Sequence, residues 1–215
     1  LYDPDGLDIT SLIDYNNKNG TIKGFSQGDS VSNEDILNIE CDFLIPAALG
    51  GVIHKMNVEK LNCRVIIEAA NGPVTPPADD ILFKKGVYVV PDILTNAGGV
   101  TVSYFEWVKN LSHIRFGRMQ RRQEEARHEM VLREFEKLSK AMGETWSLSS
   151  SFKKHYLKGA GELELVRSGL DDTMRSSFQS MREIWHERKD VTDLRTAAYL
   201  VSIGKVADSY QTKGL

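Results

Sequence analysis

The sequence has few of the features that would assign it to a membrane, an oxidising compartment or nucleic acid. It has two cysteines in 215 residues and a formal net charge of −3, and it lacks an apolar run of the ~18 residues that a membrane span needs. Cys41 and Cys63 have no His or Cys partner at ligand spacing, so we expect reduced thiols and no metal. The small net charge predicts no bulk attraction to nucleic acid. The composition is therefore typical of a soluble globular protein from a reducing compartment.

The most informative segment is the block 96–107. It begins with a side-chain amide and a glycine pair, and it continues with apolar residues at helical spacing. Glycines at a helix start let a flat ligand come close, and the free N–H groups of the first turn suit a carboxylate or a phosphate. Asn96 and Ser103 are then placed to hydrogen-bond a ligand, although an ordinary loop-to-helix junction fits this segment equally well.

A second segment of the same kind follows the β-branched run 64–67, which is typical of a buried parallel strand. Asn71 and Gly72 then turn the chain, and Thr75 with Pro76 is a favourable helix start. Asn71 is therefore expected just beyond the carboxyl end of a strand. In open α/β sheets, ligands bind at that edge.

The first half of the chain alternates between strand-like and helix-like segments. Strands are expected at 41–45, 64–67 and 86–90, and helices at 7–19, 32–38, 54–61 and 77–85. Pro46 ends the first strand, and the small residues Ala47 and Ala48 beside it leave room for a cofactor. The alternation indicates βαβ units and a parallel sheet.

Three blocks together resemble the cofactor domain of glutamate dehydrogenase: 46–48, 68–73 and 96–107. The tail 193–199 resembles that family's last helix, so the similarity runs from about Asp3 to Tyr210. The resemblance implies an incomplete Rossmann-like domain in an enzyme that oxidises L-glutamate to 2-oxoglutarate and ammonia. The hydride would pass to NAD or NADP. A homo-hexamer in the mitochondrial matrix is implied as well.

The resemblance also gives roles to individual residues. Ser103 would hydrogen-bond the γ-carboxylate of glutamate, and Val100 would pack against its carbon chain. Asn71 and Asn96 would orient the nicotinamide end, with Asn71 also close to the substrate. Ala47 and Ala48 would line the cofactor cleft.

By this resemblance, the rest of the active site is expected upstream of Leu1. The chain does not begin with methionine, and no Gly-x-Gly-x-x-Gly turn precedes residue 7 to hold a pyrophosphate. The residue that selects NAD or NADP, and the family's catalytic lysine and aspartate, are expected upstream too. We therefore predict that this is part of a longer chain, that it carries no catalytic residue of its own, and that it is inactive alone.

The second half has a different composition. From 115 to 142 there is no proline, glycine occurs only at Gly117, and charged residues surround a thin apolar stripe, which indicates a long helix with one narrow buried face. The expected order is that helix, a polar connector over 146–161, a second long helix over 162–189 and a final helix over 193–213. This order resembles the antenna and pivot helix of animal-type glutamate dehydrogenases. It implies a partial dinucleotide-binding domain at 1–111, an antenna-like part at 112–161, and the pivot and C-terminal helices at 162–215.

Four positions concern possible purine-nucleotide regulation. Arg167 stands where the animal-type family has the histidine of its GTP site, and Ser176 stands where it has the arginine of its ADP site. Arg115 replaces a small polar residue of that ADP site, and Arg175 neighbours Ser176 at about 100° around the helix. We expect regulation that differs from that of the animal enzymes.

Two other functions fit parts of the sequence. A leucine or phenylalanine dehydrogenase would share the coenzyme residues, but its apolar side-chain pocket has no use for the Ser103 hydroxyl. In a non-catalytic helical interaction module, the antenna-like half would be the functional part. A lysine-bearing substrate domain and a glycine-rich turn upstream would favour the enzyme.

Overall fold

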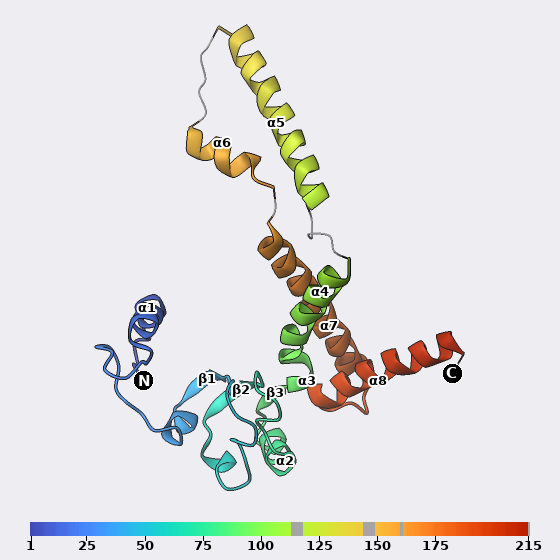
Figure 1. Cartoon of the computed structure of the whole chain (residues 1–215). Helices are drawn as coiled ribbons and strands as arrows, with labels where there is room; N and C mark the ends of the chain where they lie inside the picture. The colour runs from blue at the N-terminus through green and yellow to red at the C-terminus, as the bar shows by residue number, and fades with distance from the viewer. Residues whose placement is uncertain (113–117, 144–148, 160, 215) are drawn as a thin grey trace. The chain divides into compact units, whose positions relative to one another are not determined.

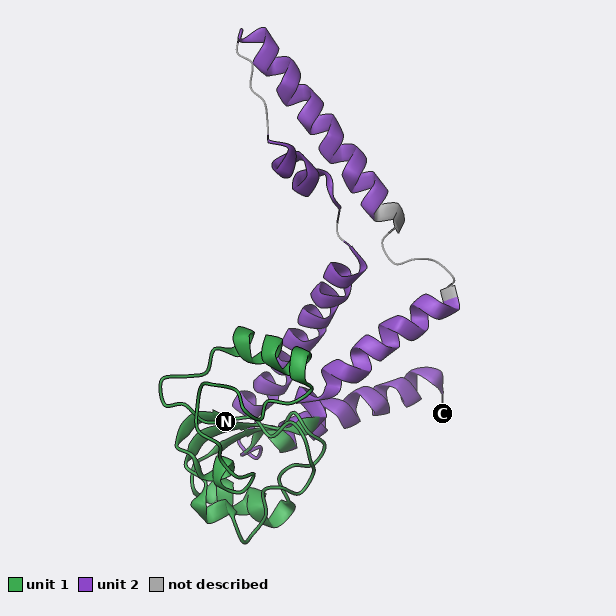
Figure 2. Cartoon of the chain, turned by 60° about the vertical axis from the view of Figure 1, so that its left-hand side comes forward, with its two compact units in different colours: residues 1–92, 193–195 green, residues 93–192, 196–215 purple. Residues whose placement is uncertain are grey.

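The computed structural model describes residues 1–112, 118–143, 149–159 and 161–214 (Figure 1). The chain forms two compact units, which Figure 2 shows in different colours. Unit 1 comprises Leu1–Asp92 and Asp193–Arg195, and unit 2 comprises Ile93–Thr192 and Thr196–Leu215. The chain therefore leaves unit 1 after Asp92, returns briefly at Asp193, and leaves it again after Arg195.

Unit 1 is built on a three-stranded parallel sheet, which confirms the predicted α/β class. Strands β1 (Cys41–Leu44), β2 (Cys63–Ile67) and β3 (Tyr88–Val90) lie in this order, with β2 in the centre. Helix α1 (Ile9–Asn19) precedes the sheet, and α2 (Pro76–Lys84) connects β2 to β3. Thr75 occupies the N-cap position of α2, as predicted, although its side chain makes no capping hydrogen bond.

The core of unit 1 lies against one face of this sheet. Ile66 of β2 packs with Ala78 and Leu82 of α2, and with Ile53 and Val58 from the connection between β1 and β2. All five are fully buried. Because β2 is the central strand, Ile66 has a strand on either side as well as the helix layer, which favours the β-branched residues that the sequence places there.

The opposite face of the sheet carries a row of apolar side chains in register. Phe43, Val65 and Tyr88 are paired across the three strands. Phe43 is 61% exposed and Tyr88 is 56% exposed. Parallel sheets are ordinarily covered on both faces, so the described part of the chain leaves one face of its sheet partly open.

Two helix predictions in unit 1 are wrong. At 54–61 the structure has only the short 3₁₀ helix η2 (Val58–Lys60). The Asn57 side chain accepts the His54 N–H at 2.8 Å and donates to the Val52 carbonyl at 2.8 Å. These local side-chain bonds compete with those of an α-helix. At 32–38 only the 3₁₀ helix η1 (Asp35–Asn38) forms.

Unit 2 is helical. Its elements are α3 (Asp92–Thr95, whose first residue belongs to unit 1), α4 (Ala97–Ser112), α5 (Arg118–Ala141), α6 (Ser150–Leu157), α7 (Glu162–Glu187) and α8 (Leu194–Lys213, whose first two residues belong to unit 1). Helix α4 packs against α7, and α5 packs against α6. The two long helices and the final helix confirm the sequence prediction. None of the described helices is both long and apolar enough to cross a bilayer.

The connector predicted over 146–161 contains a helix that the sequence analysis missed. Helix α6 begins after Ser149, whose hydroxyl oxygen accepts the Phe152 N–H at 3.2 Å. The Phe152 and Tyr156 rings stack at 5.6 Å between centroids, and Tyr156 lies 4.8 Å from the His128 ring of α5. The two aromatic residues are four apart in the sequence, and this spacing was the available signal. Gly143, two residues after the end of α5, adopts a left-handed conformation.

Candidate functional site

The loops that follow β1 and β2 are joined by main-chain hydrogen bonds. The Ala70 N–H donates to the Pro46 carbonyl at 2.8 Å, and the Gly51 N–H donates to the Gly72 carbonyl at 2.8 Å. Both loops lie at the carboxyl ends of parallel strands. The predicted edge is therefore present in unit 1, and it is formed by the two segments that the sequence analysis selected.

The residues predicted to line a ligand are accessible at this edge. Ala47, Ala48 and Asn71 are all exposed. Gly72 has φ +53°, so the turn after Asn71 uses the left-handed conformation that glycine adopts without strain. At Gly50 a Cβ would lie 2.8 Å from the Asn71 carbonyl oxygen, which is closer than two such atoms normally approach. The edge is consequently open to a ligand but tightly packed within itself.

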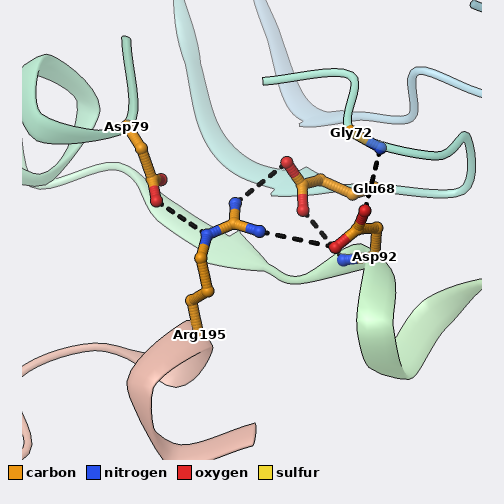
Figure 3. A network of polar contacts seen from close by, with 5 residues as sticks. All are labelled: Glu68, Gly72, Asp79, Asp92 and Arg195. Atoms are coloured by element: carbon orange, nitrogen blue, oxygen red, sulfur yellow. Dashed lines mark hydrogen bonds and ion pairs between the residues drawn. The ribbon is translucent and has the colours of Figure 1, made fainter. Parts of the chain in front are cut away.

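An arginine from a distant part of the chain is linked to this edge by a network of polar contacts (Figure 3). Arg195, in the first turn of α8, contacts three carboxylates of unit 1. Its Nη2 is 2.9 Å from Glu68, its Nε is 2.7 Å from Asp79, and its Nη1 is 3.5 Å from Asp92. Glu68 is fully buried, whereas the Arg195 side chain is 24% exposed. A buried carboxylate requires such a partner, since its desolvation is otherwise uncompensated.

The electrostatics of this cluster favour a permanently charged Arg195. Burial alone would lower the pKa of its guanidinium, but the hydrogen bonds from Arg195 to Glu68 and Asp79 outweigh burial and raise the pKa above its ordinary value. The cluster continues through main-chain donors: the Asp92 N–H donates to Glu68 Oε2 at 2.8 Å, and the Gly72 N–H donates to Asp92 Oδ2 at 2.8 Å. The network thus reaches the turn that contains Asn71.

Sequence reasoning did not find this network. Glu68 was part of a recognised block and Arg195 part of the last helix, but nothing in the sequence paired them across 127 residues. One indirect signal existed, because a glutamate directly after an apolar strand needs a buried cation or donors. The sequence offered no means of choosing among its arginines and lysines.

The other predicted ligand residues lie in unit 2, around the start of α4. Asn96 precedes the first residue of the helix, and its carbonyl accepts the Gly99 N–H at 3.2 Å. The Ser103 hydroxyl donates to the Gly99 carbonyl at 3.1 Å. Val100 is 68% exposed, and Ser103 is exposed as well. The predicted helix start is confirmed, and Val100 and Ser103 are accessible on it.

The glycine pair of this helix shows where space remains. A Cβ on Gly98 would lie 3.6 Å from Leu170 of α7, in ordinary van der Waals contact, whereas a Cβ on Gly99 would meet nothing within 4 Å. A Cβ on Gly169 of α7 would lie 3.4 Å from the Phe105 ring of α4. Packing within unit 2 therefore does not require a glycine at Gly99.

Of the candidate regulatory residues, three lie on α7. Arg167 and Ser176 are exposed. The Arg175 Nε donates to Asp171 at 2.7 Å, and this ion pair raises the pKa of the guanidinium. Arg175 therefore has an acidic partner one helical turn away. The fourth candidate, Arg115, lies outside the described residues.

The two cysteines are free thiols that lie opposite each other on β1 and β2. Burial raises the pKa of both Cys41 and Cys63, which makes their thiolates less available at neutral pH. Within the described ranges, no three His, Cys, Asp or Glu side chains gather as a metal site would require.

Comparison with known proteins gives a consistent result. A model of the Glutamate/Leucine/Phenylalanine/Valine dehydrogenase family matches residues 1–169. A probable glutamate dehydrogenase of Sinorhizobium fredii is 42% identical over 207 residues, which are 95% of this chain and 45% of that protein. The mitochondrial glutamate dehydrogenase of Dictyostelium discoideum is 42% identical over the whole chain and 41% of its own length. The chain thus spans less than half the length of these relatives.

Solved structures agree with the sequence relatives. The crystal structure of glutamate dehydrogenase from Peptoniphilus asaccharolyticus matches the whole chain with a TM-score of 0.59 and 25% identity, over 37% of that chain. A hetero-hexameric glutamate dehydrogenase from Thermus thermophilus, in a leucine-bound form, matches with a TM-score of 0.67 and 20% identity, over 39% of that chain. The second of these supports the fold alone.

Proposed function

The chain belongs to the Glutamate/Leucine/Phenylalanine/Valine dehydrogenase family, and on this basis we propose that the protein containing it oxidises L-glutamate to 2-oxoglutarate and ammonia. The hydride passes to NAD or NADP. The observation that carries the proposal is the 42% identity to a probable glutamate dehydrogenase over 95% of the chain. Because this chain spans 45% of that relative, its residues supply only part of the active site.

The residues proposed for the coenzyme are Ala47, Ala48 and Asn71 in unit 1 and Asn96 in unit 2. Ala47 and Ala48 are small and exposed, so they leave room for a flat ring beside the β1 loop. Asn71, on the joined loop after β2, and Asn96, before α4, offer amide donors and acceptors that orient a carboxamide. These features fit a nicotinamide coenzyme, which when bound supplies the hydride acceptor. The residues of this chain contribute positioning and exclusion of water.

The substrate side uses the exposed face of α4. Ser103 now donates its hydroxyl proton to the Gly99 carbonyl. We propose that it turns this donor to the γ-carboxylate of bound glutamate, which is a stronger acceptor because it is charged. Val100 packs against the methylene groups of the substrate, and Asn71 is a further proposed substrate contact. The general base and the remaining substrate contacts belong to the part of the enzyme outside this chain.

The finer features of the parent protein are also proposals. We propose a homo-hexamer with residues 112–161 as an antenna, since α5 exposes the apolar side chains of Met130, Phe135 and Leu138. The partial dinucleotide-binding domain spans 1–111, and the pivot and C-terminal helices span 162–215. Arg115, Arg167, Arg175 and Ser176 are the proposed determinants of the response to purine nucleotides. A mitochondrial matrix location is supported by the Dictyostelium discoideum relative, although other relatives are bacterial.

The test is a pair of serine variants in the full-length enzyme. Ser103→Ala removes the proposed glutamate donor, and Ser202→Ala is the matched control, because its hydroxyl also donates to the carbonyl four residues earlier, at 2.8 Å. Loss of a hydrogen bond to a charged group is worth about 1.5–3 kcal/mol, so kcat/KM for glutamate should fall about 10- to 150-fold in Ser103→Ala. The coenzyme KM should stay unchanged, and Ser202→Ala should behave as wild type. Unchanged glutamate kinetics in Ser103→Ala would remove this residue from the substrate site.

A further inference from the structure

The Arg195 network holds together groups that would otherwise repel. Three carboxylates contact one guanidinium. Negative charges gathered in this way repel one another unless a cation lies between them. The planar guanidinium has donors on several edges, which lets it bond different acceptors at once. Arg195 is thus the group that allows Glu68, Asp79 and Asp92 to stay close together.

The network also reaches the coenzyme edge by a defined path. Glu68 directly follows β2, and Asp92 follows β3 by two residues. Asp92 accepts the Gly72 N–H through Oδ2 and faces Arg195 with Oδ1, as Figure 3 shows. The Gly72 N–H is therefore held by the Asp92 carboxylate, which Arg195 faces, while Glu68 accepts the main-chain N–H of Asp92.

The network also lies at the two points where the chain leaves unit 1. The chain leaves unit 1 directly after Asp92 and directly after Arg195, and these two residues contact each other at 3.5 Å. Both exits from unit 1 are therefore held beside the turn that contains Asn71. Asp79, by contrast, contacts Arg195 from the first turn of α2.

We propose that Arg195 is a positioning residue for the coenzyme: by holding Asp92 against Glu68, it fixes the Asn71–Gly72 turn in the geometry that binds the nicotinamide end. This inference rests on the proposed function, in which Asn71 contacts the coenzyme. Arg195 touches neither coenzyme nor substrate. Its loss lets Asp92 move away from Glu68, releases the Gly72 N–H, and weakens coenzyme binding more than glutamate binding.

The experiment compares Arg195→Met with Arg188→Met in the full-length enzyme. Arg188 is the control because its ion pair with Asp190 is exposed and lies outside the network. Arg195→Met should raise the dissociation constant of the reduced coenzyme, measured by fluorescence titration, about tenfold or more, as expected when a bond to a charged group is lost. Glutamate KM should change less than the coenzyme constant, and Arg188→Met should match wild type. Equal coenzyme affinity in Arg195→Met and wild type would overturn the proposal.

A conservative variant separates positioning from a general loss of structure, because Arg195→Lys keeps a positive charge facing the three carboxylates. Arg195→Lys should fall between wild type and Arg195→Met, since an ammonium lacks the planar fork.

A second pair of variants decides the question if Arg195→Met does not fold. Asp92→Ala removes the acceptor of the Gly72 N–H, whereas Asp79→Ala removes only a contact on the other side of Arg195. Asp92→Ala should weaken coenzyme binding several-fold more than Asp79→Ala, and equal effects would contradict the proposal. Failure of the proposed function would look different, because the wild-type enzyme would then show no glutamate-dependent reduction of either coenzyme.

Discussion

Gly50 offers a direct test of how tightly the coenzyme edge is packed. A Cβ at this position would lie 2.8 Å from the Asn71 carbonyl oxygen and 3.5 Å from the Gly72 carbonyl oxygen. Both atoms are main-chain atoms, so no side chain can turn away to make room. In Gly50→Ala either the loop after β1 or the turn after β2 must move, and overpacking of this kind costs about 1–3 kcal/mol.

Movement of either segment should displace the proposed coenzyme contacts. The same two segments are joined by the bond from the Gly51 N–H to the Gly72 carbonyl and by the bond from the Ile53 N–H to the Pro73 carbonyl, at 2.8 and 2.9 Å. Moving either segment strains these bonds and shifts Asn71. Gly50→Ala should therefore lower the urea midpoint of the full-length enzyme and raise its coenzyme KM, with a smaller effect on glutamate KM.

Gly204→Ala is the matched control for this experiment. Gly204 lies in α8, and a Cβ there would meet nothing within 4 Å. Alanine is favoured over glycine in a helix by about 0.5–1 kcal/mol, so the same chemical change should raise the urea midpoint at Gly204 and lower it at Gly50. A Gly50→Ala enzyme as stable as wild type, with an unchanged coenzyme KM, would refute the close packing of this edge.

Three further predictions concern the core, a helix cap and the regulatory surface. Leu82→Ala, at a fully buried position, should destabilise unit 1 by about 2–5 kcal/mol, measured by thermal unfolding; a cost below about 1 kcal/mol would contradict the core assignment. Hydrogen bonds from Ser11 lower the pKa of Asp8 in the folded chain. The stability that ionised Asp8 gives to α1 is therefore fully present above the ordinary aspartate pKa, and it is lost as the pH falls through the lowered pKa of the folded chain. Amide exchange at the start of α1 should show this loss, and Asp8→Asn should abolish the pH dependence. Ser176→Arg should strengthen activation by ADP at fixed glutamate and coenzyme concentrations, since a guanidinium binds phosphate through several donors. An ADP titration identical to that of wild type would show that the serine at position 176 does not weaken ADP activation.

The sequence was sufficient for the elements whose determinants are local. Strands β2 and β3 follow from short β-branched runs. Together with β1, they lie within two residues of their predicted bounds. The turn at Gly72 follows from the Asn-Gly pair, and its positive φ confirms the reason for that choice. The start of α4 near Asn96 follows from the change to helical periodicity.

The errors arose where side-chain contacts compete with local preference. At 54–61 a helix was expected between two strands, but the Asn57 side chain bonds the main chain of His54 and Val52 instead. At 150–157 the polar composition hid a helix that Tyr156 stabilises against His128 of α5. The Arg195 network was out of reach for a different reason, because its contacts join residues 103 to 127 positions apart.

The most direct test of the central claim is a rate measurement on the full-length protein. Purified enzyme is assayed for the formation of reduced NAD or NADP with L-glutamate, L-leucine, L-phenylalanine or L-valine, and the 215-residue chain is assayed beside it. The account predicts that the full-length enzyme has its highest kcat/KM with glutamate, and that the 215-residue chain alone gives no turnover. A preference for an apolar amino acid would contradict the substrate assignment, and turnover by the chain alone would contradict its place as only part of the active site.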